Sequence, residues 1–231
     1  GGDITFNTPL NFNGNETFTV TVSDGALIDL QSFIVTVIPV NDAPVADTST
    51  GETAEDKSLV VTLSGSDVDG DVLIFSLGNN AVNGSVVIDG NIATYTPNQD
   101  YNGDDSFTFT VSDGELDDSA TVTLTIDPVN DAPVLTSIDE FSNLIEFNED
   151  DIYYFEQLLI GSDVDGDALT FSIAGGNQIT AALIGSDVIF SASSDYNGME
   201  EFSITVSDGL LSNTQALYAL VYAINDAPVA N

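Results

Sequence analysis

Two short segments of the chain place carboxylates at alternate positions. The sequence GSDVDGD occurs at residues 65–71 and again at residues 161–167. The acidic residues in these segments are Asp67, Asp69, Asp71, Asp163, Asp165 and Asp167. Three carboxylates so close together repel one another unless they share a cation. Hard oxygen ligands on a loop that a Gly can bend suit Ca²⁺, so we expect calcium ligands in both segments.

The EF-hand loop is a rival interpretation of the same segments. It requires a bidentate Glu at its twelfth position, and that position is Gly78 in the first copy and Ala174 in the second. Strand-like rather than helical sequence flanks both copies, which also disfavours an EF-hand. A different kind of calcium site is therefore predicted. The simpler alternative is that these Asp residues only form turns, as Asp, Asn and Gly often do.

The charge balance limits the classes of partner. The 231 residues include 38 Asp and Glu, a single cationic side chain (Lys57), and no Arg, His or Cys, for a formal charge of −37. A chain without Arg has no surface for phosphate groups, which excludes nucleic acid, and anionic membrane surfaces would repel it. No apolar run reaches the length of a membrane span, so no membrane insertion is expected. Because 42% of the residues are hydrophobic, the chain can still build a core, and a divalent cation is the simplest way to offset its self-repulsion.

Three segments of the chain repeat one another. They are FNGNETFTVTVSDG at residues 12–25, YNGDDSFTFTVSDG at residues 101–114 and YNGMEEFSITVSDG at residues 196–209. Each is followed by an NDAPV tag, and the copies recur about every 90 residues, which suits a series of small domains. The sequence therefore predicts the end of a first repeat at residues 1–44, a second repeat at residues 45–133, and a third repeat with the start of the next linker at residues 134–231.

Apolar residues alternate along the second repeat as they do in half-buried strands. The segments SFTFTVS and TVTLTI show the pattern best, and SLVVTL, VLIFSL, GSVVI and NIATYT provide four more strands. The residues predicted to face the core are Phe107, Phe109, Val111, Val122, Leu124 and Ile126. Seven or so short antiparallel strands in about 90 residues predict an all-β chain of tandem immunoglobulin-like Greek-key β-sandwiches, end to end.

The first repeat is incomplete. Its predicted strands are residues 4–7, 18–22 and 33–38, which correspond to the last three strands of a sandwich. A half-sandwich of this kind would expose an apolar face made of Phe18, Val20, Val35 and Val37. Either the sequence was cut at this point, or strands of another copy of the protein complete the sandwich.

Taken together, these motifs resemble those of the cadherin family and its bacterial cadherin-like relatives. The tags at residues 129–133 and 224–228 are similar to the linker that ends a cadherin repeat. The Asp-x-Asp pairs in GSDVDGD match the central cadherin motif. The SDG turns, which contain Asp113 and Asp208, match a motif at the end of the penultimate strand.

The resemblance adds further candidate ligands. A Glu near the first strand of each complete repeat matches a cadherin Glu, whereas the cadherin Asp-Arg-Glu motif is replaced by DYNG, whose Asp and Asn could donate oxygens instead. The residues added are Glu55, Asp100 and Asn102 in the second repeat and Glu149, Asp195 and Asn197 in the third.

In cadherins the calcium ions lie between successive domains, and the resemblance implies the same here. The junction of the first and second repeats would use Asn41, Asp42, Asp67, Asp69 and Asp113. The junction of the second and third would use Glu55, Asp100, Asn102, Asn130 (through its carbonyl), Asp131, Asp163, Asp165 and Asp208. At the C-terminal end, Glu149, Asp195, Asn197 and Asp226 would form an incomplete cluster that awaits the next repeat.

The resemblance implies a structural or adhesive role without catalysis. We expect a calcium-stiffened segment of an extracellular adhesin, surface stalk or filament, with neighbouring repeats and possible further copies of the protein as partners. A carbohydrate-binding accessory module of a secreted polysaccharide-degrading protein is the alternative, and it would need an exposed aromatic platform. Glycoside hydrolysis by a carboxylate pair and an isopeptide bond from Lys57 in the core are weaker alternatives.

Some acidic and aromatic residues are expected to have no ligand role. The acidic residues expected to be solvated hairpin charges are Asp104, Asp105, Asp117 and Asp118. Tyr101 and Tyr196, at the start of the repeated segments, are expected to pack at the core or at a corner of the sandwich.

Overall fold

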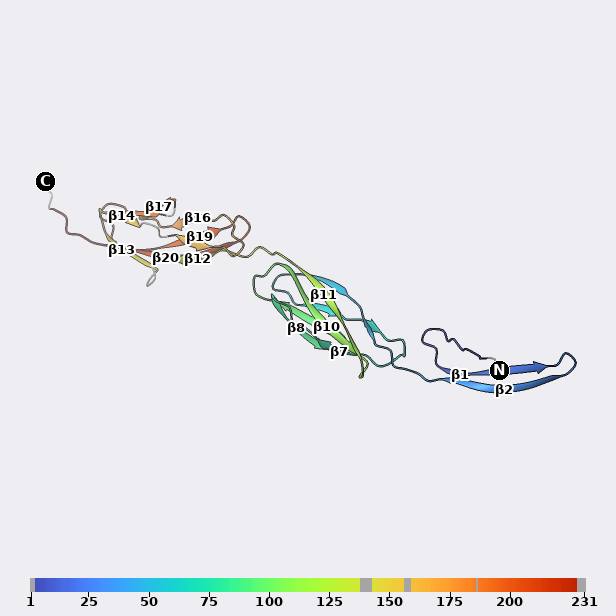
Figure 1. Cartoon of the computed structure of the whole chain (residues 1–231). Coiled ribbons are helices and arrows are strands. Elements are labelled where there is room, and N and C mark those ends of the chain that lie inside the picture. The colour runs from blue at the N-terminus through green and yellow to red at the C-terminus, as the bar shows by residue number, and fades with distance from the viewer. Residues whose placement is uncertain (1–2, 138–142, 156–158, 186, 228–231) are drawn as a thin grey trace. The chain divides into compact units, whose positions relative to one another are not determined.

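The computed structural model describes residues 3–137, 143–155, 159–185 and 187–227. Within these ranges the chain forms strands and no helix, which confirms the all-β prediction, and none of the described segments is a helix able to cross a membrane. The chain divides into two compact units, residues 1–128 and 129–231, whose strands are drawn in Figure 1. The predicted limits of the three repeats at residues 44 and 133 stay a prediction.

The first unit begins with an isolated hairpin. Strand β1 (Gly14–Ser23) pairs antiparallel with β2 (Ile28–Val37). The third strand predicted here, at residues 4–7, is wrong: this segment pairs with no strand, and Phe6 instead packs its ring against Phe18, with centroids 4.9 Å apart. Of the predicted apolar face, Val20 is exposed, whereas Phe18, Val35 and Val37 are half-buried.

The rest of the first unit is a sandwich of two sheets. The larger sheet has the strand order β4-β11-β10-β7 and the smaller has the order β5-β9-β8. The strands are β4 (Ser49–Ala54), β5 (Leu59–Thr62), β7 (Ile74–Leu77), β8 (Gly84–Asp89), β9 (Ile92–Pro97), β10 (Gly103–Ser112) and β11 (Asp117–Asp127), and the short β3 (Val45–Ala46) pairs with β6 (Gly65–Ser66). The six strands predicted for this repeat are confirmed. Strand β4, which runs parallel to β11, escaped prediction because its sequence STGETA has no apolar alternation.

The core of this sandwich lies between its sheets. Each of the six residues predicted to face the core is at most 2% exposed, because alternate side chains of β10 and β11 point to the same face. They pack with Ala93 and Tyr95 of β9, which are fully buried. Burying one such side chain contributes about 1.5–3 kcal/mol, so the alternation that predicts the strands also accounts for much of their stability.

The second unit repeats this architecture. Its sheets have the orders β13-β20-β19-β16 and β14-β18-β17, and β12 pairs with β15. The strands are β12 (Val134–Ser137), β13 (Leu144–Asn148), β14 (Ile152–Phe155), β15 (Ile160–Ser162), β16 (Thr170–Gly175), β17 (Ile179–Ile184), β18 (Asp187–Ala192), β19 (Gly198–Ser207) and β20 (Ser212–Tyr222). In Figure 1 the strands β14 and β17 lie above β13 and β20, with the core of this unit between the two layers. As in the first unit, the first strand of the larger sheet runs parallel to the last, here β13 to β20.

Candidate metal sites

The loop after β6 folds around one carboxylate. Asp67 Oδ1 accepts hydrogen bonds from the amides of Asp69 (2.8 Å), Gly70 (3.0 Å) and Asp71 (3.4 Å). Gly70 has φ +83°, a conformation that L side chains rarely adopt, and it turns the loop back on itself. Carboxylate oxygens of Asp67, Asp69 and Asp71 lie within 4.8 Å of one another. The other oxygen of Asp67, Oδ2, is buried and has no hydrogen-bond partner among the described residues.

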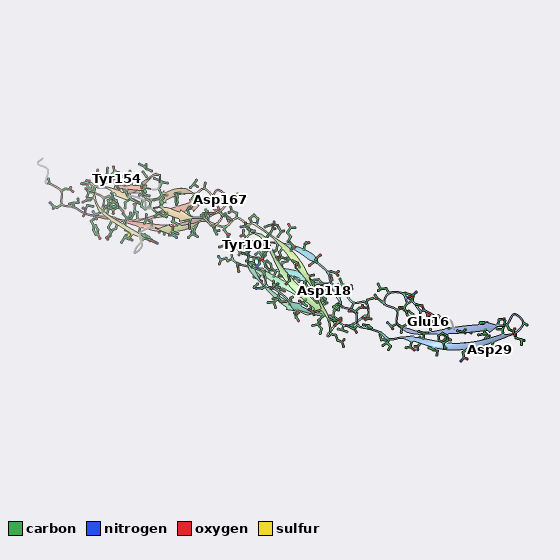
Figure 2. All side chains as sticks on the ribbon, in the orientation of Figure 1. Glu16, Asp29, Tyr101, Asp118, Tyr154 and Asp167 are labelled. Atoms are coloured by element: carbon green, nitrogen blue, oxygen red, sulfur yellow. The ribbon has the colours of Figure 1, made fainter. Side chains whose placement is uncertain are left out.

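The second unit contains the same loop after β15. Asp163 Oδ1 accepts hydrogen bonds from the amides of Asp165 (3.0 Å) and Asp167 (3.3 Å). Oxygens of these three residues again lie within 4.8 Å of one another, and Asp163 Oδ2 is buried without a partner in the described part of the chain. Figure 2 places Asp167 at the end of this sandwich that lies away from Tyr154. The loop thus has the same arrangement in both units.

The first two NDAP linkers are each tied to the sandwich that follows them. In the first unit the Asn41 side chain donates to Asp113 Oδ2 (2.8 Å), and the amide of Asp42 donates to Asp69 Oδ2 (2.8 Å). In the second unit Asn130 donates in the same way to Asp208 Oδ2 (2.9 Å), and the amide of Asp131 donates to Asp165 Oδ2 (2.8 Å). The structure therefore brings the predicted linker residues to the predicted loop and turn residues.

The turn carboxylates near the linkers are held in the ionised form. The backbone amides of Leu116 and Glu115, followed by the Asn41 side chain, hold the pKa of Asp113 below its ordinary value. For Asp208 the Asn130 side chain is the largest cause of a lowered pKa, with help from three backbone amides against the opposing effect of burial. Ionised carboxylates are the form that binds a cation.

The predicted ligands of the second repeat's C-terminal end also lie together. Glu55 is only 2% exposed, and the Asn102 side chain donates to its Oε2 (3.4 Å). The amide of Asp100 donates to Asp56 Oδ1 (3.2 Å). These residues follow β4 and β9, at the end of β11 opposite Asp113. Asp56 was not among the predicted ligands, although it directly follows one of them.

The equivalent end of the second unit gathers four carboxylates. Oxygens of Asp150, Asp195 and Asp226 lie within 4.8 Å of one another. Glu149 is 3% exposed, and its Oε1 accepts a hydrogen bond from the amide of Ile224 (2.7 Å) in the segment that leads to Asp226. Its Oε2 is buried and unpartnered within the described ranges. Asp150 was missed by the sequence analysis, and the signal that could have found it is the Glu-Asp pair that recurs at residues 55–56 and 149–150.

The predicted ligand Asn197 is exposed to solvent. It lies two residues after Asp195, in the turn that precedes β19. Its counterpart Asn102 is exposed too but contacts Glu55.

The donor set fits calcium. Ca²⁺ takes six to eight oxygen ligands at 2.3–2.6 Å, so two oxygens on one ion lie at most about 5 Å apart. The carboxylates of each DVDGD loop meet this limit, and the chain has no His or Cys that would favour a softer metal. A buried carboxylate oxygen without a donor is costly in both units, and a shared cation would offset that cost.

Two of the acidic residues expected to be solvated are not. Asp105 is 8% exposed and accepts hydrogen bonds from the amides of Val82 (3.1 Å) and Asn83 (2.9 Å) and from the Tyr95 hydroxyl (3.0 Å). Asp118 is half-buried and accepts the amide of Ala46 (2.9 Å). The prediction was wrong because it passed over the alternation of β10 and β11, which places Asp105 and Asp118 on the face that the core residues occupy. Asp104 and Asp117 are exposed, as expected.

Other sequence predictions concern residues away from the metal ligands. Tyr101 packs against the core and donates its hydroxyl to the Asp104 carbonyl (2.7 Å), and Tyr196 packs against the core of the second unit, so both are core or corner residues as predicted. Lys57 is exposed, which disagrees with an isopeptide bond in the core.

Glu200 occupies the position of Asp105 in the third repeat, and its acid form should weaken the fold. Burial raises the pKa of Glu200, but the amides of Asn177, Gln178 and Ile179 and the Tyr196 hydroxyl outweigh burial, so the pKa lies below its ordinary value of 4.5. A lowered folded pKa contributes stability above the unfolded pKa, and this contribution is lost as pH falls through the folded pKa. Glu200→Gln should therefore reduce the free energy of unfolding at pH 7, and the difference from wild type should shrink below pH 4.5.

Urea denaturation followed by circular dichroism at several pH values measures this difference. The matched control is Glu201→Gln, because Glu201 is the exposed neighbour on the same strand. A difference between Glu200→Gln and wild type that stays constant from pH 7 to the acid range would contradict the prediction.

Comparison with known families identifies two copies of one domain. The family model described as "Bacterial Ig domain" matches residues 41–125 and residues 130–219. No curated protein matches the chain in sequence.

Cadherin structures share the fold at low identity. Human protocadherin-24 EC1-2 is 18% identical with a TM-score of 0.50, covering 81% of this chain and 100% of that one. Drosophila N-cadherin EC1-4 is 13% identical with a TM-score of 0.51, covering 92% of this chain and 58% of that one. An endo-fucoidan hydrolase from glycoside hydrolase family 107 is 21% identical with a TM-score of 0.36, and the match covers 94% of this chain and only 35% of that one. This chain therefore spans about a third of the length of the hydrolase.

Proposed function

The chain belongs to the bacterial Ig domain family, in two tandem copies, and we propose that it is a calcium-stiffened structural segment of an extracellular adhesin, surface stalk or filament. Its sandwich fold is the one seen in cadherin extracellular domains. Domains of these families are typically non-catalytic, in keeping with a chain that has no His, Cys or Arg.

The observation that carries the proposal is the buried carboxylate oxygen of each DVDGD loop. Asp67 Oδ2 and Asp163 Oδ2 are shielded from water and receive no hydrogen bond from the described residues, although each carboxylate belongs to a group of three. A buried carboxylate oxygen without a partner is unfavourable, and crowding of carboxylates raises that cost further. The same unsatisfied oxygen recurs at equivalent positions of both repeats, which supports a shared ligand-binding role over chance.

The residues that would hold the ion are the loop carboxylates Asp67, Asp69 and Asp71, with their counterparts Asp163, Asp165 and Asp167. Bound calcium would supply a positive charge that these carboxylates share. The loop amides already orient Asp67 and Asp163, so little rearrangement is needed for their free oxygens to bind.

The linkers provide the mechanical effect. Asn41 and Asp42 anchor the first NDAP segment to the Asp113 turn and to Asp69 of the loop. Asp69 thus accepts a hydrogen bond from the linker amide of Asp42 and is also one of the three clustered loop carboxylates. A cation that neutralises these carboxylates would therefore also stabilise the attachment of the linker. Without neutralisation, repulsion among the loop carboxylates would favour opening of the loop and release of the linker. A chain whose linkers are fixed to the following domains is stiffer than one whose linkers move freely.

The extracellular location is part of the proposal and is supported by the fold shared with cadherin extracellular domains. Extracellular calcium modules typically bind at about 10⁻⁴–10⁻³ M, far weaker than cytosolic calcium buffers. Sites of this strength fill only where calcium is abundant. The excess of negative charge also keeps a long exposed chain soluble.

Calcium titration by isothermal calorimetry tests the proposal. The full chain should bind more than one Ca²⁺ with dissociation constants in the range of about 10⁻⁴–10⁻³ M. Asp67→Asn and Asp163→Asn should each remove or weaken binding at one loop, because each replaces the carboxylate that holds the buried oxygen. The matched control is Asp89→Asn, at an exposed position at the end of β8. Absence of binding at millimolar calcium would refute the proposal.

Small-angle scattering tests the stiffening itself. The largest dimension of the full chain should increase, and its distribution should narrow, when calcium replaces chelator. The Asp67→Asn, Asp163→Asn double variant should stay in the broad distribution in both conditions. Equal distributions for the wild type with and without calcium would leave calcium binding without the proposed mechanical role.

A further inference from the structure

The outer face of the larger sheet in the second unit is apolar and aromatic. Along β20 the side chains of Leu217, Ala219 and Val221 are at most 2% exposed and form the core. Tyr218 and Tyr222, at even positions of the same strand, therefore point to the opposite face, where they are 36% and 48% exposed. Because they are four residues apart on one strand, their Cα atoms are separated by about 13 Å.

Neighbouring strands extend this face. In the register of the sheet, Leu144 of β13 lies opposite Tyr218 on one side, and Glu201 of β19 lies opposite it on the other. Met199 of β19, 59% exposed, is next to Leu220. A shallow hollow of about 370 Å³ is lined by Asn143, Leu144, Met199 and Tyr218. Its size is within the range of small-ligand sites.

Polar acceptors flank the aromatic rings. The Tyr222 hydroxyl donates to Glu146 Oε1 (2.6 Å), and this bond is the main reason why the pKa of Tyr222 is raised. The bond holds the ring against β13 with a carboxylate at its edge. Asn148 lies opposite Tyr222 in the register, and Glu201 lies opposite Tyr218. Each ring thus has a hydrogen-bonding side chain of a neighbouring strand beside it.

The first unit shows that the fold does not require this face. Aligning the repeated segments and the two hairpin registers places Thr123 at the position of Tyr218 and Asp127 at the position of Tyr222. Asp104 likewise takes the position of Met199. The same sheet therefore folds with polar residues in the second repeat, so the fold itself does not require the aromatic residues of the third repeat.

We propose that this face binds a neutral polysaccharide chain. Tyr218 and Tyr222 would stack on the C–H faces of sugar rings, and the carboxylates Glu146 and Glu201 would accept hydrogen bonds from sugar hydroxyls. Because both tyrosines lie on the same face of one strand, one extended sugar chain could contact both.

Charge selects this occupant. The chain carries a formal charge of −37 with one cationic side chain, and Glu146 and Glu201 flank the rings, so an acidic polysaccharide or the same face of a second copy would be repelled here. A neutral sugar chain is not repelled, and its hydroxyls are donors for a face whose charged groups are acceptors only. The site lies within one sheet and does not depend on the calcium proposal.

Affinity electrophoresis of the full chain tests the proposal. The native gels contain one of four polysaccharides: mixed-linkage β-glucan, galactomannan, laminarin or, as the anionic probe, sulfated fucoidan. We expect retardation by at least one of the three neutral polymers and none by fucoidan. The test variant is Tyr218→Thr, Tyr222→Asp, which copies the residues of the second repeat and so should fold. It should weaken binding about tenfold, because two stacking contacts are lost.

A control separates the face from exposed tyrosine in general. Tyr154 is 66% exposed on β14 of the other sheet (Figure 2), and Tyr154→Thr should leave retardation unchanged. Three outcomes would overturn the proposal. They are no retardation by any neutral polymer, retardation by fucoidan alone, or a loss of retardation in the Tyr154 variant equal to that in the Tyr218, Tyr222 double variant. Binding of a cationic protein such as lysozyme that the double variant abolishes, without polysaccharide binding, would also overturn it by assigning the face to a protein partner.

Discussion

Removal of calcium should lower the melting temperature of the full chain by roughly 10–20 °C. A ligand that binds only the folded state stabilises it by about 2.7 kcal/mol per site at a hundred times its dissociation constant. Each kcal/mol shifts the melting temperature of a small domain by about 4–8 °C. The loops around Asp67 and Asp163 are the two proposed calcium sites, so both sandwiches should respond.

Differential scanning calorimetry in calcium and in chelator measures this shift. Magnesium at the same concentration should restore little of it, because Mg²⁺ demands octahedral geometry and gives up its water reluctantly. In the Asp67→Asn variant the transition of the first unit should lose its calcium dependence while that of the second unit keeps it. A wild-type melting temperature that is the same in calcium and in chelator would contradict the stabilising role.

Asp105→Ala should destabilise the first sandwich by about 3–5 kcal/mol, the largest effect expected of any single polar substitution here. The Asp105 carboxylate receives the amides of Val82 and Asn83, which fold the loop before β8 onto β10, and the hydroxyl of the fully buried Tyr95. Removing the acceptor takes the partner from two part-buried amides and leaves the Tyr95 hydroxyl only its 3.4 Å bond to the Asn83 carbonyl, at a cost of about 1–3 kcal/mol for each donor left unsatisfied. Burial of Tyr95, followed by its bond to Asp105, raises the pKa of that tyrosine, so the hydroxyl stays a donor at neutral pH.

Urea denaturation gives the loss of stability, and hydrogen exchange locates it. The amides of Val82 and Asn83 should lose their protection first. Asp104→Ala is the matched control, since Asp104 is the exposed neighbour on the same strand, and it should change the free energy of unfolding by less than about 0.5 kcal/mol. Equal effects of the two substitutions would show that the buried carboxylate is not the anchor of the loop.

The strands and the core could be predicted because their signal is local. Phe107, Phe109 and Val111 alternate with polar residues along one strand, and the pleat alone sends them to the same face. The DVDGD loops are equally local, since Asp67 bonds to amides two to four residues further along the chain. The type and spacing of these residues therefore determined the all-β fold, the repeats and the candidate loop ligands.

The remaining features depend on segments that only the tertiary structure brings together. Asp150, Asp195 and Asp226 belong to three loops more than 30 residues apart, so no local pattern predicts that they meet. Asp105 continues the inward-facing alternation of Phe107, Phe109 and Val111, but only the tertiary structure shows that a loop more than 20 residues upstream folds onto it and donates to its carboxylate.

The aromatic face of the second unit shows the same division. The alternation along β20 predicts that Tyr218 and Tyr222 lie on the same face of the strand. Only the pairing of β20 with β13 and β19 shows which residues surround them. Strand alternation fixes which residues share a face, whereas the order and register of strands, set by packing of the whole domain, decide which faces meet the core and which meet solvent.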